Sequence, residues 1–209
     1  MIKALMLVFM PVRTWDEIVQ AQRGVLKILT IYLLPLLLVT SLIEGYGLVH
    51  WGEPQTIIKR QKLFTLNEAA AFEGVQLVLS LFVVFTGAGI VKSLGETFHG
   101  RHNFRQAITT VTYGLSPLFT LRIVDAFSIN PWIAWAAGIT LTTVILYHGV
   151  PRVMDPDPAH GFGLYLMSTL ILAMATGLVR FLTAWYLQGR FGLPEATSLL
   201  HNSARHLVA

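Results

Sequence analysis

Four ionisable side chains interrupt the long apolar runs of this 209-residue chain, and a charge in such a run needs a chemical explanation. They are Glu44, Arg122, Asp125 and Arg180, and their formal charges sum to zero. A charged side chain at the middle of a membrane helix costs about 2.5–3.5 kcal/mol, so we expect the four to compensate one another. The i to i+3 spacing of Arg122 and Asp125 favours a pair on one helix face, which leaves Glu44 and Arg180 to pair between helices.

Two interpretations of these intramembrane charges stay open. In the first, the charges tie several helices together and fix their register, with some side chains reaching toward the membrane surface. In the second, the same residues line a path for a substrate or a proton. We take the structural interpretation as the leading one.

The histidines offer a second, weaker chemical pattern. His99 and His102 form an H-x-x-H pair, which suits a metal only if the segment is helical. Gly100 between them disfavours that helix, so we expect interfacial loop histidines and no metal site. The chain has no cysteine, which excludes disulfides and thiolate chemistry. It also has no nucleophile elbow, phosphate loop or zincin motif, and we predict a protein that is not an enzyme and needs no cofactor.

The composition places these residues in a lipid bilayer. The chain is 54% hydrophobic and 12% charged, whereas about a quarter of the residues of a soluble domain are charged. The alternating pattern of a membrane barrel is absent. We therefore predict an all-α, polytopic membrane helical bundle that forms one domain over residues 28–187. The apolar runs predict five transmembrane helices at residues 28–49, 74–94, 106–127, 132–149 and 162–187.

The lysines and arginines of the short segments orient this bundle. One side carries Lys3, Arg13, Arg23, Lys27, Lys92, Arg101, Arg105 and Arg152, and the other carries Lys59, Arg60, Lys62, Arg190 and Arg205. This excess predicts a cytoplasmic N-terminus and an outer C-terminus, with the four intramembrane charges in the outer half. Because the basic residues are scattered over loops, the net charge of +4 does not indicate a nucleic-acid partner.

Two segments flank the predicted bundle. Residues 1–27 are expected to lie at the cytoplasmic interface, where Thr14 caps a short helix, Trp15 and Ile18 rest on the headgroups, and Arg13 meets anionic lipid. The same residues could instead dock a cytoplasmic partner. Residues 188–209 predict an amphipathic helix along the outer surface.

Small residues and prolines mark expected kinks and close helix contacts. Pro35 should bend the first span, and the run Tyr113-Gly114-Leu115-Ser116-Pro117 should kink the third near Gly114. Gly87 and Gly89 should give the second span a small surface for tight packing.

These motifs resemble the Yip domain family, the Ypt/Rab-GTPase-interacting membrane proteins, and in particular its compact bacterial branch. The most specific similarity is the run of residues 113–117, which follows Asn103-Phe104-Arg105-Gln106-Ala107. The segment Pro11-Val12-Arg13-Thr14-Trp15 with Ile18 and the segment Tyr147-His148-Gly149-Val150-Pro151 with Met154, Pro156, Gly161 and Phe162 are also similar to family segments.

The resemblance implies five spans, a cytoplasmic N-terminus and an outer C-terminus. Eukaryotic members carry a long cytoplasmic N-terminal region and take part in Rab binding and in traffic between endoplasmic reticulum and Golgi. The segment before the first span is short here, so GTPase binding is not carried over. We expect a bacterial cytoplasmic membrane, with the endoplasmic reticulum or Golgi membrane as the alternative in a eukaryote.

The leading functional hypothesis is a non-enzymatic membrane scaffold, adaptor or accessory subunit whose partners are membrane lipid and other membrane proteins. The alternative is a small-solute or ion transporter or channel that uses the intramembrane charges.

Overall fold

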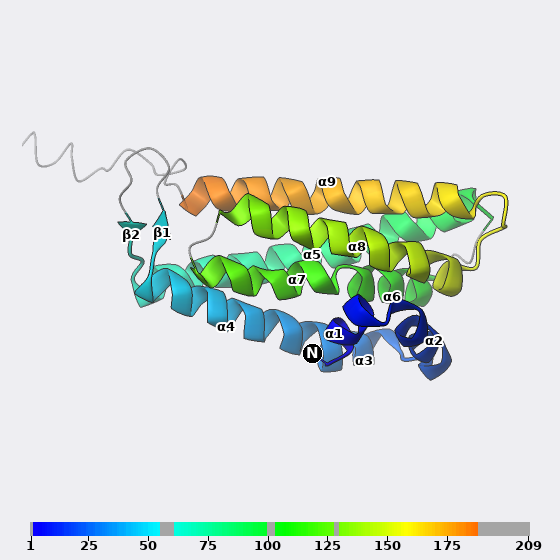
Figure 1. Ribbon diagram of the computed structural model, residues 1–209, viewed down its shortest axis with the longest axis horizontal. Helices are drawn as coiled ribbons and strands as arrows, with labels where there is room; N and C mark the ends of the chain where they lie inside the picture. Colours follow the sequence, from blue (N-terminus) through cyan, green and yellow to red (C-terminus); the bar gives the residue numbers. More distant parts are fainter. Residues whose placement is uncertain (1, 55–60, 100–102, 128–129, 188–209) are drawn as a thin grey trace, which may run out of the picture.

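The computed structural model describes residues 2–54, 61–99, 103–127 and 130–187. Long helices lie side by side along the longest axis of the molecule (Figure 1). The described residues contain five helical segments long and apolar enough to cross a membrane, which confirms the predicted five-span bundle. The predicted outer tail, 188–209, lies outside the described residues.

Three of the spans are continuous helices and two are interrupted. The continuous ones are α5 (Leu66–Thr97), α8 (Pro131–Met154) and α9 (Gly161–Leu187). The first span joins α3 (Val25–Ile28), the π-helical turn η1 (Leu29–Leu33) and α4 (Leu34–His50). The third joins α6 (Phe104–Gly114), α7 (Ser116–Leu121) and the 3-10 helix η2 (Arg122–Phe127).

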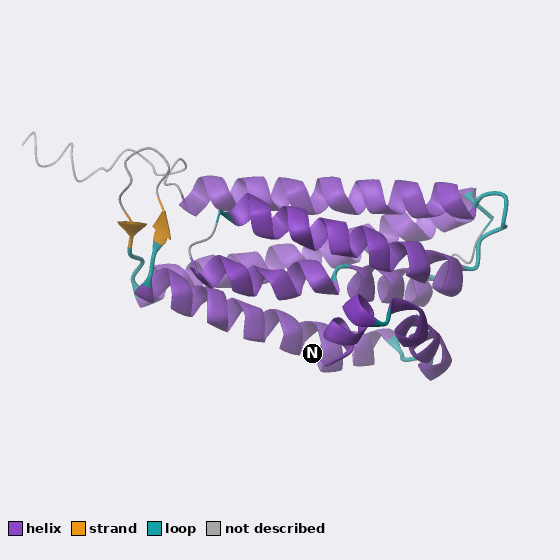
Figure 2. Ribbon diagram, viewed as in Figure 1, coloured by secondary structure: helices purple, strands orange, loops and turns teal. Residues whose placement is uncertain are grey.

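Two short strands and two short helices complete the described chain. The strands β1 (Glu53–Pro54) and β2 (Gln61–Lys62) form an antiparallel ribbon at one end of the bundle (Figure 2). The helices α1 (Ile2–Phe9) and α2 (Pro11–Ala21) lie beside the bundle near its opposite end (Figure 1).

The second span is longer than its hydropathy predicts, because α5 begins at a polar cap. The Thr65 side chain accepts from the Glu68 backbone N–H at 3.3 Å, and the Glu68 carboxylate accepts from the Thr65 N–H at 2.9 Å. This capping box satisfies the free N–H groups of the first turn. As a result Glu73, which lies just outside the predicted boundary at residue 74, belongs to the span.

Proline accounts for both interrupted spans. The π-helical turn η1 immediately precedes Pro35, whose ring and missing N–H disfavour a regular α-helical turn there. In the third span, Pro117 cannot donate to the carbonyl of Tyr113, and the Ser116 hydroxyl donates to that carbonyl at 2.6 Å instead. The break falls at Leu115, between α6 and α7 and next to the kink predicted at Gly114.

The glycines differ in how closely they approach neighbouring helices. A Cβ on Gly114 would overlap Leu146 of α8, and one on Gly87 would overlap Leu172 of α9. At both positions the absence of a side chain lets the neighbouring leucine pack against the helix backbone. A Cβ on Gly89, in contrast, would meet nothing within 4 Å, so the prediction that Gly89 packs against a neighbour is wrong.

The N-terminal helices pack against the bundle, and Trp15 does not rest on headgroups as predicted. Trp15 is fully buried, and its Nε1 donates to the carbonyl of Ile145 in α8 at 3.0 Å. The indole lies over Gly149, where a Cβ would collide with it. Trp15 also meets Tyr113 edge to face, with ring centroids 6.3 Å apart. A tryptophan that fits this pocket is removed from the lipid interface altogether.

The neighbours of Trp15 also differ from the prediction. Ile18 is buried in the same contact, and Thr14 is buried inside α2 instead of capping it, with its hydroxyl donating to Met10 O at 2.8 Å. The helix begins at Pro11, whose fixed φ suits the first helical position. Of the predicted interfacial residues, Arg13 is the exposed one, 3.5 Å from Glu17.

Replacing Trp15 tests whether its buried hydrogen bond holds the N-terminal helices. W15F keeps most of the apolar contact but loses the N–H donor, so we expect a loss of about 0.5–1.5 kcal/mol in stability. Thermal melting in mild detergent, together with protease cleavage within residues 1–21, measures the effect. W51F is the matched control, because Trp51 is 44% exposed. Equal shifts for both variants would contradict this role of the hydrogen bond.

Candidate functional site: a buried charge cluster

Five ionisable side chains from four spans meet near one end of the bundle, and we call them the charge cluster. Glu44 comes from α4, Glu73 from α5, Arg122 and Asp125 from η2, and Arg180 from α9. Each lies on the order of 10 Å or less from the end of its span that faces the β1–β2 ribbon, at about 1.5–2.0 Å per residue. The cluster therefore occupies one depth.

Arg122 is the centre of the cluster. Its Nη2 donates to Glu44 Oε2 at 2.7 Å and to Glu73 Oε2 at 2.9 Å, and its Nε donates to Glu44 Oε2 at 2.9 Å. The side chains of Arg122, Glu44 and Glu73 are 9%, 3% and 10% exposed. Charge-assisted hydrogen bonds of this length, shielded from solvent, tie α4, α5 and η2 together.

Two uncharged polar groups complete the surroundings of this guanidinium. With its amide oxygen turned toward Arg122, Gln76 accepts from Nη2 at 3.0 Å and from Nε at 3.1 Å. The opposite orientation would set an NH2 group against these donors, so the hydrogen-bond network assigns the oxygen to this side. The Ser41 hydroxyl lies 3.5 Å from Nη2.

Asp125 and Arg180 form the second ion pair of the cluster. Arg180 Nη2 lies 2.8 Å from Asp125 Oδ1, and the two side chains are 11% and 8% exposed. The predicted pairs, Arg122 with Asp125 and Glu44 with Arg180, are therefore wrong. The physical reason is the packing of η2 on α4, where Gly47 lets the backbone of Ala126 approach closely and brings Arg122 to the carboxylate of Glu44.

Sequence reasoning missed Glu73. Its position looked like a boundary, because the hydropathic run begins one residue later. The signal that could have placed it inside the span is the T-x-x-E capping box at Thr65 and Glu68, which marks where α5 begins.

A small cavity lies beside the charge cluster, between α5, α7, η2, α8 and α9, and most of its surface is apolar. Its volume is about 60 Å³, and one water needs about 10–15 Å³ of such space. Arg122 Nη1 and Arg180 Nε have no hydrogen-bond partner among the described residues. Unpaired buried donors beside such a cavity favour bound water. The polar side chains that line the cavity are Gln76, Ser80, Arg122, Asp125, Thr176, Arg180 and Thr183.

The weak metal candidates do not come together with other ligands in the described part of the chain. His99 lies with its ring centroid 5.7 Å from that of His160, and His102 lies outside the described residues. No three histidine, aspartate or glutamate side chains gather there as a metal site would require.

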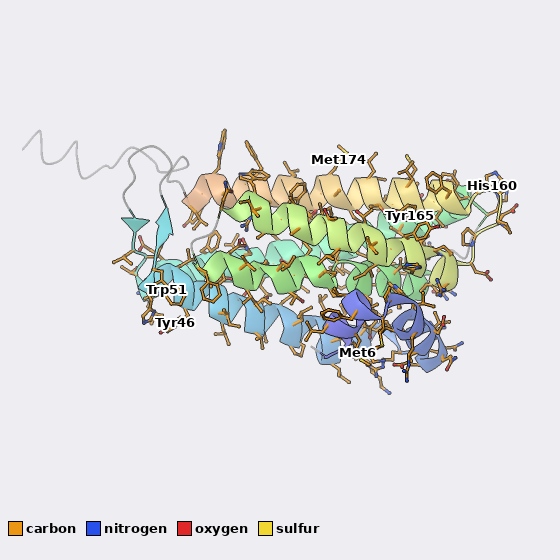
Figure 3. All side chains as sticks on the ribbon, viewed as in Figure 1. Met6, Tyr46, Trp51, His160, Tyr165 and Met174 are labelled. Carbon is orange, nitrogen blue, oxygen red and sulfur yellow. The ribbon has the colours of Figure 1, made fainter. Side chains whose placement is uncertain are left out.

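A wider groove lies at the opposite end of the bundle, where α8 joins α9. Its volume is about 490 Å³. Tyr165 and His160, which are labelled in Figure 3, lie at this end, and Tyr46 and Trp51 lie at the other. The rings of Tyr147 and Tyr165 meet edge to face with centroids 5.4 Å apart. The residues that line this groove are Tyr147, His148, Pro151, Arg152, Pro156, Pro158, Gly161, Phe162 and Tyr165.

The fold and the charge cluster together define a multi-pass helical membrane protein whose intramembrane charges are paired between spans. The family model of the Yip1 domain matches residues 5–181, and the chain belongs to this family. This confirms the family resemblance of the motifs. No curated protein and no solved structure gives a significant match to the chain.

A double-mutant cycle tests the observed pairing. D125N and R180M each leave the other residue of the pair buried without its counterion. Each single variant should therefore lose about 3–5 kcal/mol in the free energy of unfolding. The double variant should lose less than the sum, with a coupling of about 0.5–3 kcal/mol. For E44Q combined with R180M, the loss of stability should be close to the sum of the two single losses. Melting in detergent measures these losses. A coupling energy between Glu44 and Arg180 that is larger than the one between Asp125 and Arg180 would contradict the structure.

Proposed function

We propose that this Yip1-domain protein is a non-enzymatic membrane scaffold or adaptor, or an accessory subunit of a larger membrane complex. The observation that carries the proposal is the groove where α8 joins α9, because it exposes aromatic side chains at one end of the bundle. Tyr147 is 54% exposed and Phe162 is 67% exposed. Exposed tyrosine, phenylalanine and arginine side chains around a concave surface are typical anchors of protein interfaces.

The groove is also held in a defined shape. Arg152 on its rim donates from Nε to Asp16 of α2 at 3.1 Å and from Nη1 to the carbonyl of His148 at 2.8 Å. The groove is therefore linked to the N-terminal helices, which Trp15 fixes on α8. A preformed surface loses less conformational entropy when a partner binds.

The charge cluster supports a structural role for the intramembrane charges. Its carboxylates all lie within 3 Å of a guanidinium nitrogen, so the charges serve contacts between spans. Elsewhere the spans expose large apolar side chains such as Leu42 and Met174, which suit contact with lipid or with another membrane protein. Met174 points away from the bundle in Figure 3.

The distribution of lysine and arginine supports a cytoplasmic position for the N-terminal helices and for this groove. The C-terminus would then lie outside. The resemblance to the compact bacterial branch of the family supports a bacterial cytoplasmic membrane as the location.

Site-directed photo-crosslinking in native membranes tests the scaffold proposal. A photoreactive amino acid at Phe162 should form one defined adduct with a partner protein, because this side chain lies on the groove. The same amino acid at Met174, which is 67% exposed on α9, is the matched control and should not form this adduct. Y147A should weaken the Phe162 adduct severalfold. Equal labelling at both positions, or none at Phe162, would count against the groove as a docking surface.

A transporter or channel is the second candidate, and the small cavity lined in part by Arg122, Asp125 and Arg180 favours it. Flux measurements separate the two functions. Under the scaffold proposal, proteoliposomes that contain the purified chain should pass protons, sodium, potassium and chloride no faster than protein-free liposomes. A flux that D125N or E44Q abolishes would overturn the scaffold proposal in favour of transport.

A further inference from the structure

The charge cluster has more carboxylates than guanidinium groups. The four charges predicted from the sequence sum to zero, but Glu73 adds a third carboxylate against the two arginines. With every group ionised, the cluster carries one net negative charge inside the membrane-spanning part of the chain. A buried charge without compensation is costly in a medium of low dielectric constant, and either a proton or a cation removes that cost.

Glu73 is the carboxylate with the least compensation. Glu44 accepts two hydrogen bonds from Arg122, at 2.7 and 2.9 Å, and Asp125 has a guanidinium of its own in Arg180. Glu73 accepts one hydrogen bond from Arg122, whose charge it shares with Glu44. Its Oε1 is buried and has no hydrogen-bond partner among the described residues, and the side chain is only 10% exposed. Asp125 Oδ1 also lacks a well-aligned hydrogen bond there, but it lies 2.8 Å from Arg180 Nη2. An unpaired carboxylate oxygen in this setting is the favoured place for a proton.

Each element packed against Glu73 contributes to its electrostatic environment. The first span presents Glu44, a like charge, together with Ser41. The 3-10 helix η2 presents Arg122, whose attraction is divided between Glu73 and Glu44. The same helix carries Asp125. On α9, Arg180 is engaged by Asp125. The positive charge near Glu73 is therefore already shared.

A lipid-facing groove links Glu73 to the end of the bundle. It runs between α4 and α5, has a volume of about 480 Å³, and includes Ser41, Glu73 and the exposed His50 in its lining. Gly45 lets the Glu73 side chain pack closely against α4, because a Cβ there would stand 3.3 Å from Glu73 Cγ. The groove reaches from the depth of Glu73 to His50 at the end of α4, and its lining is largely apolar.

We propose that the charge cluster is a binding site for one exchangeable proton, carried by Glu73. The reaction is an acid–base equilibrium in which the Glu73 carboxylate takes a proton from hydronium. An O–H bond forms on the carboxyl, an O–H bond of hydronium breaks to leave water, and the charge of the cluster rises from minus one to zero. The proposal is independent of the scaffold function, since a partner docks at the opposite end of the bundle.

Infrared difference spectroscopy of the full chain in lipid nanodiscs tests the site. At neutral pH the wild-type protein should show the carbonyl band of one protonated carboxyl group, which decreases as the pH is raised. E73Q should lack this band, because its amide replaces the neutral acid. E96Q is the matched control on the same helix, since Glu96 is half exposed and pairs with Lys92 at 3.6 Å, and it should keep the band.

Three results would overturn the proposal. First, the wild-type protein could show no band of a protonated carboxyl group at neutral pH. This result would reject the proposal even if E73Q does not fold. The band could persist in E73Q, which would place the proton elsewhere. Sodium or potassium could abolish the band at constant pH, which would make a metal cation the ligand. In support, the melting temperature of the wild type should fall as the pH rises, whereas that of E73Q should change less.

Discussion

The compensation of buried charge in a lipid-facing bundle is the constraint on which the rest of this structure depends. Within the bilayer no water replaces a lost partner, so each ionised group must find its counterion inside the protein. Arg122 meets this requirement for Glu44 and Glu73 together and so fixes the register of α4, α5 and η2. The pair of Asp125 with Arg180 extends the same constraint to α9.

The interrupted third span makes this arrangement possible. Pro117 ends the α-helical run that begins at Phe104, and the Ser116 hydroxyl satisfies the carbonyl that the proline leaves free. The span then tightens into η2, which carries Arg122 and Asp125. On the other side of the break, Tyr113 packs against Trp15. Two segments that mark the family in the sequence are thus in contact, and both support the position of the third span.

The two ends of the bundle differ in what they offer to other molecules. Near the end that carries β1 and β2, the charged side chains of the cluster are buried and paired with one another, and Glu73 is the carboxyl to which we assign a proton. At the other end, α8, α9 and their connection form an exposed aromatic groove, and the N-terminal helices lie beside the bundle near this end (Figure 1). This division suits a protein that is stabilised inside the membrane by its charges and meets its partners at the membrane surface.

The sequence by itself determined the five spans, the family and the presence of charges at one depth, because hydropathy, basic loop residues and short motifs are local properties. Only the tertiary structure decided which charges pair, that Glu73 joins them, and that Trp15 is buried on α8. Ion pairing depends on the rotation and approach of whole helices, which Gly47 and the 3-10 geometry of η2 control. An indole suits a headgroup region and a protein pocket equally well, so its place is settled by the close approach of α2 to Gly149.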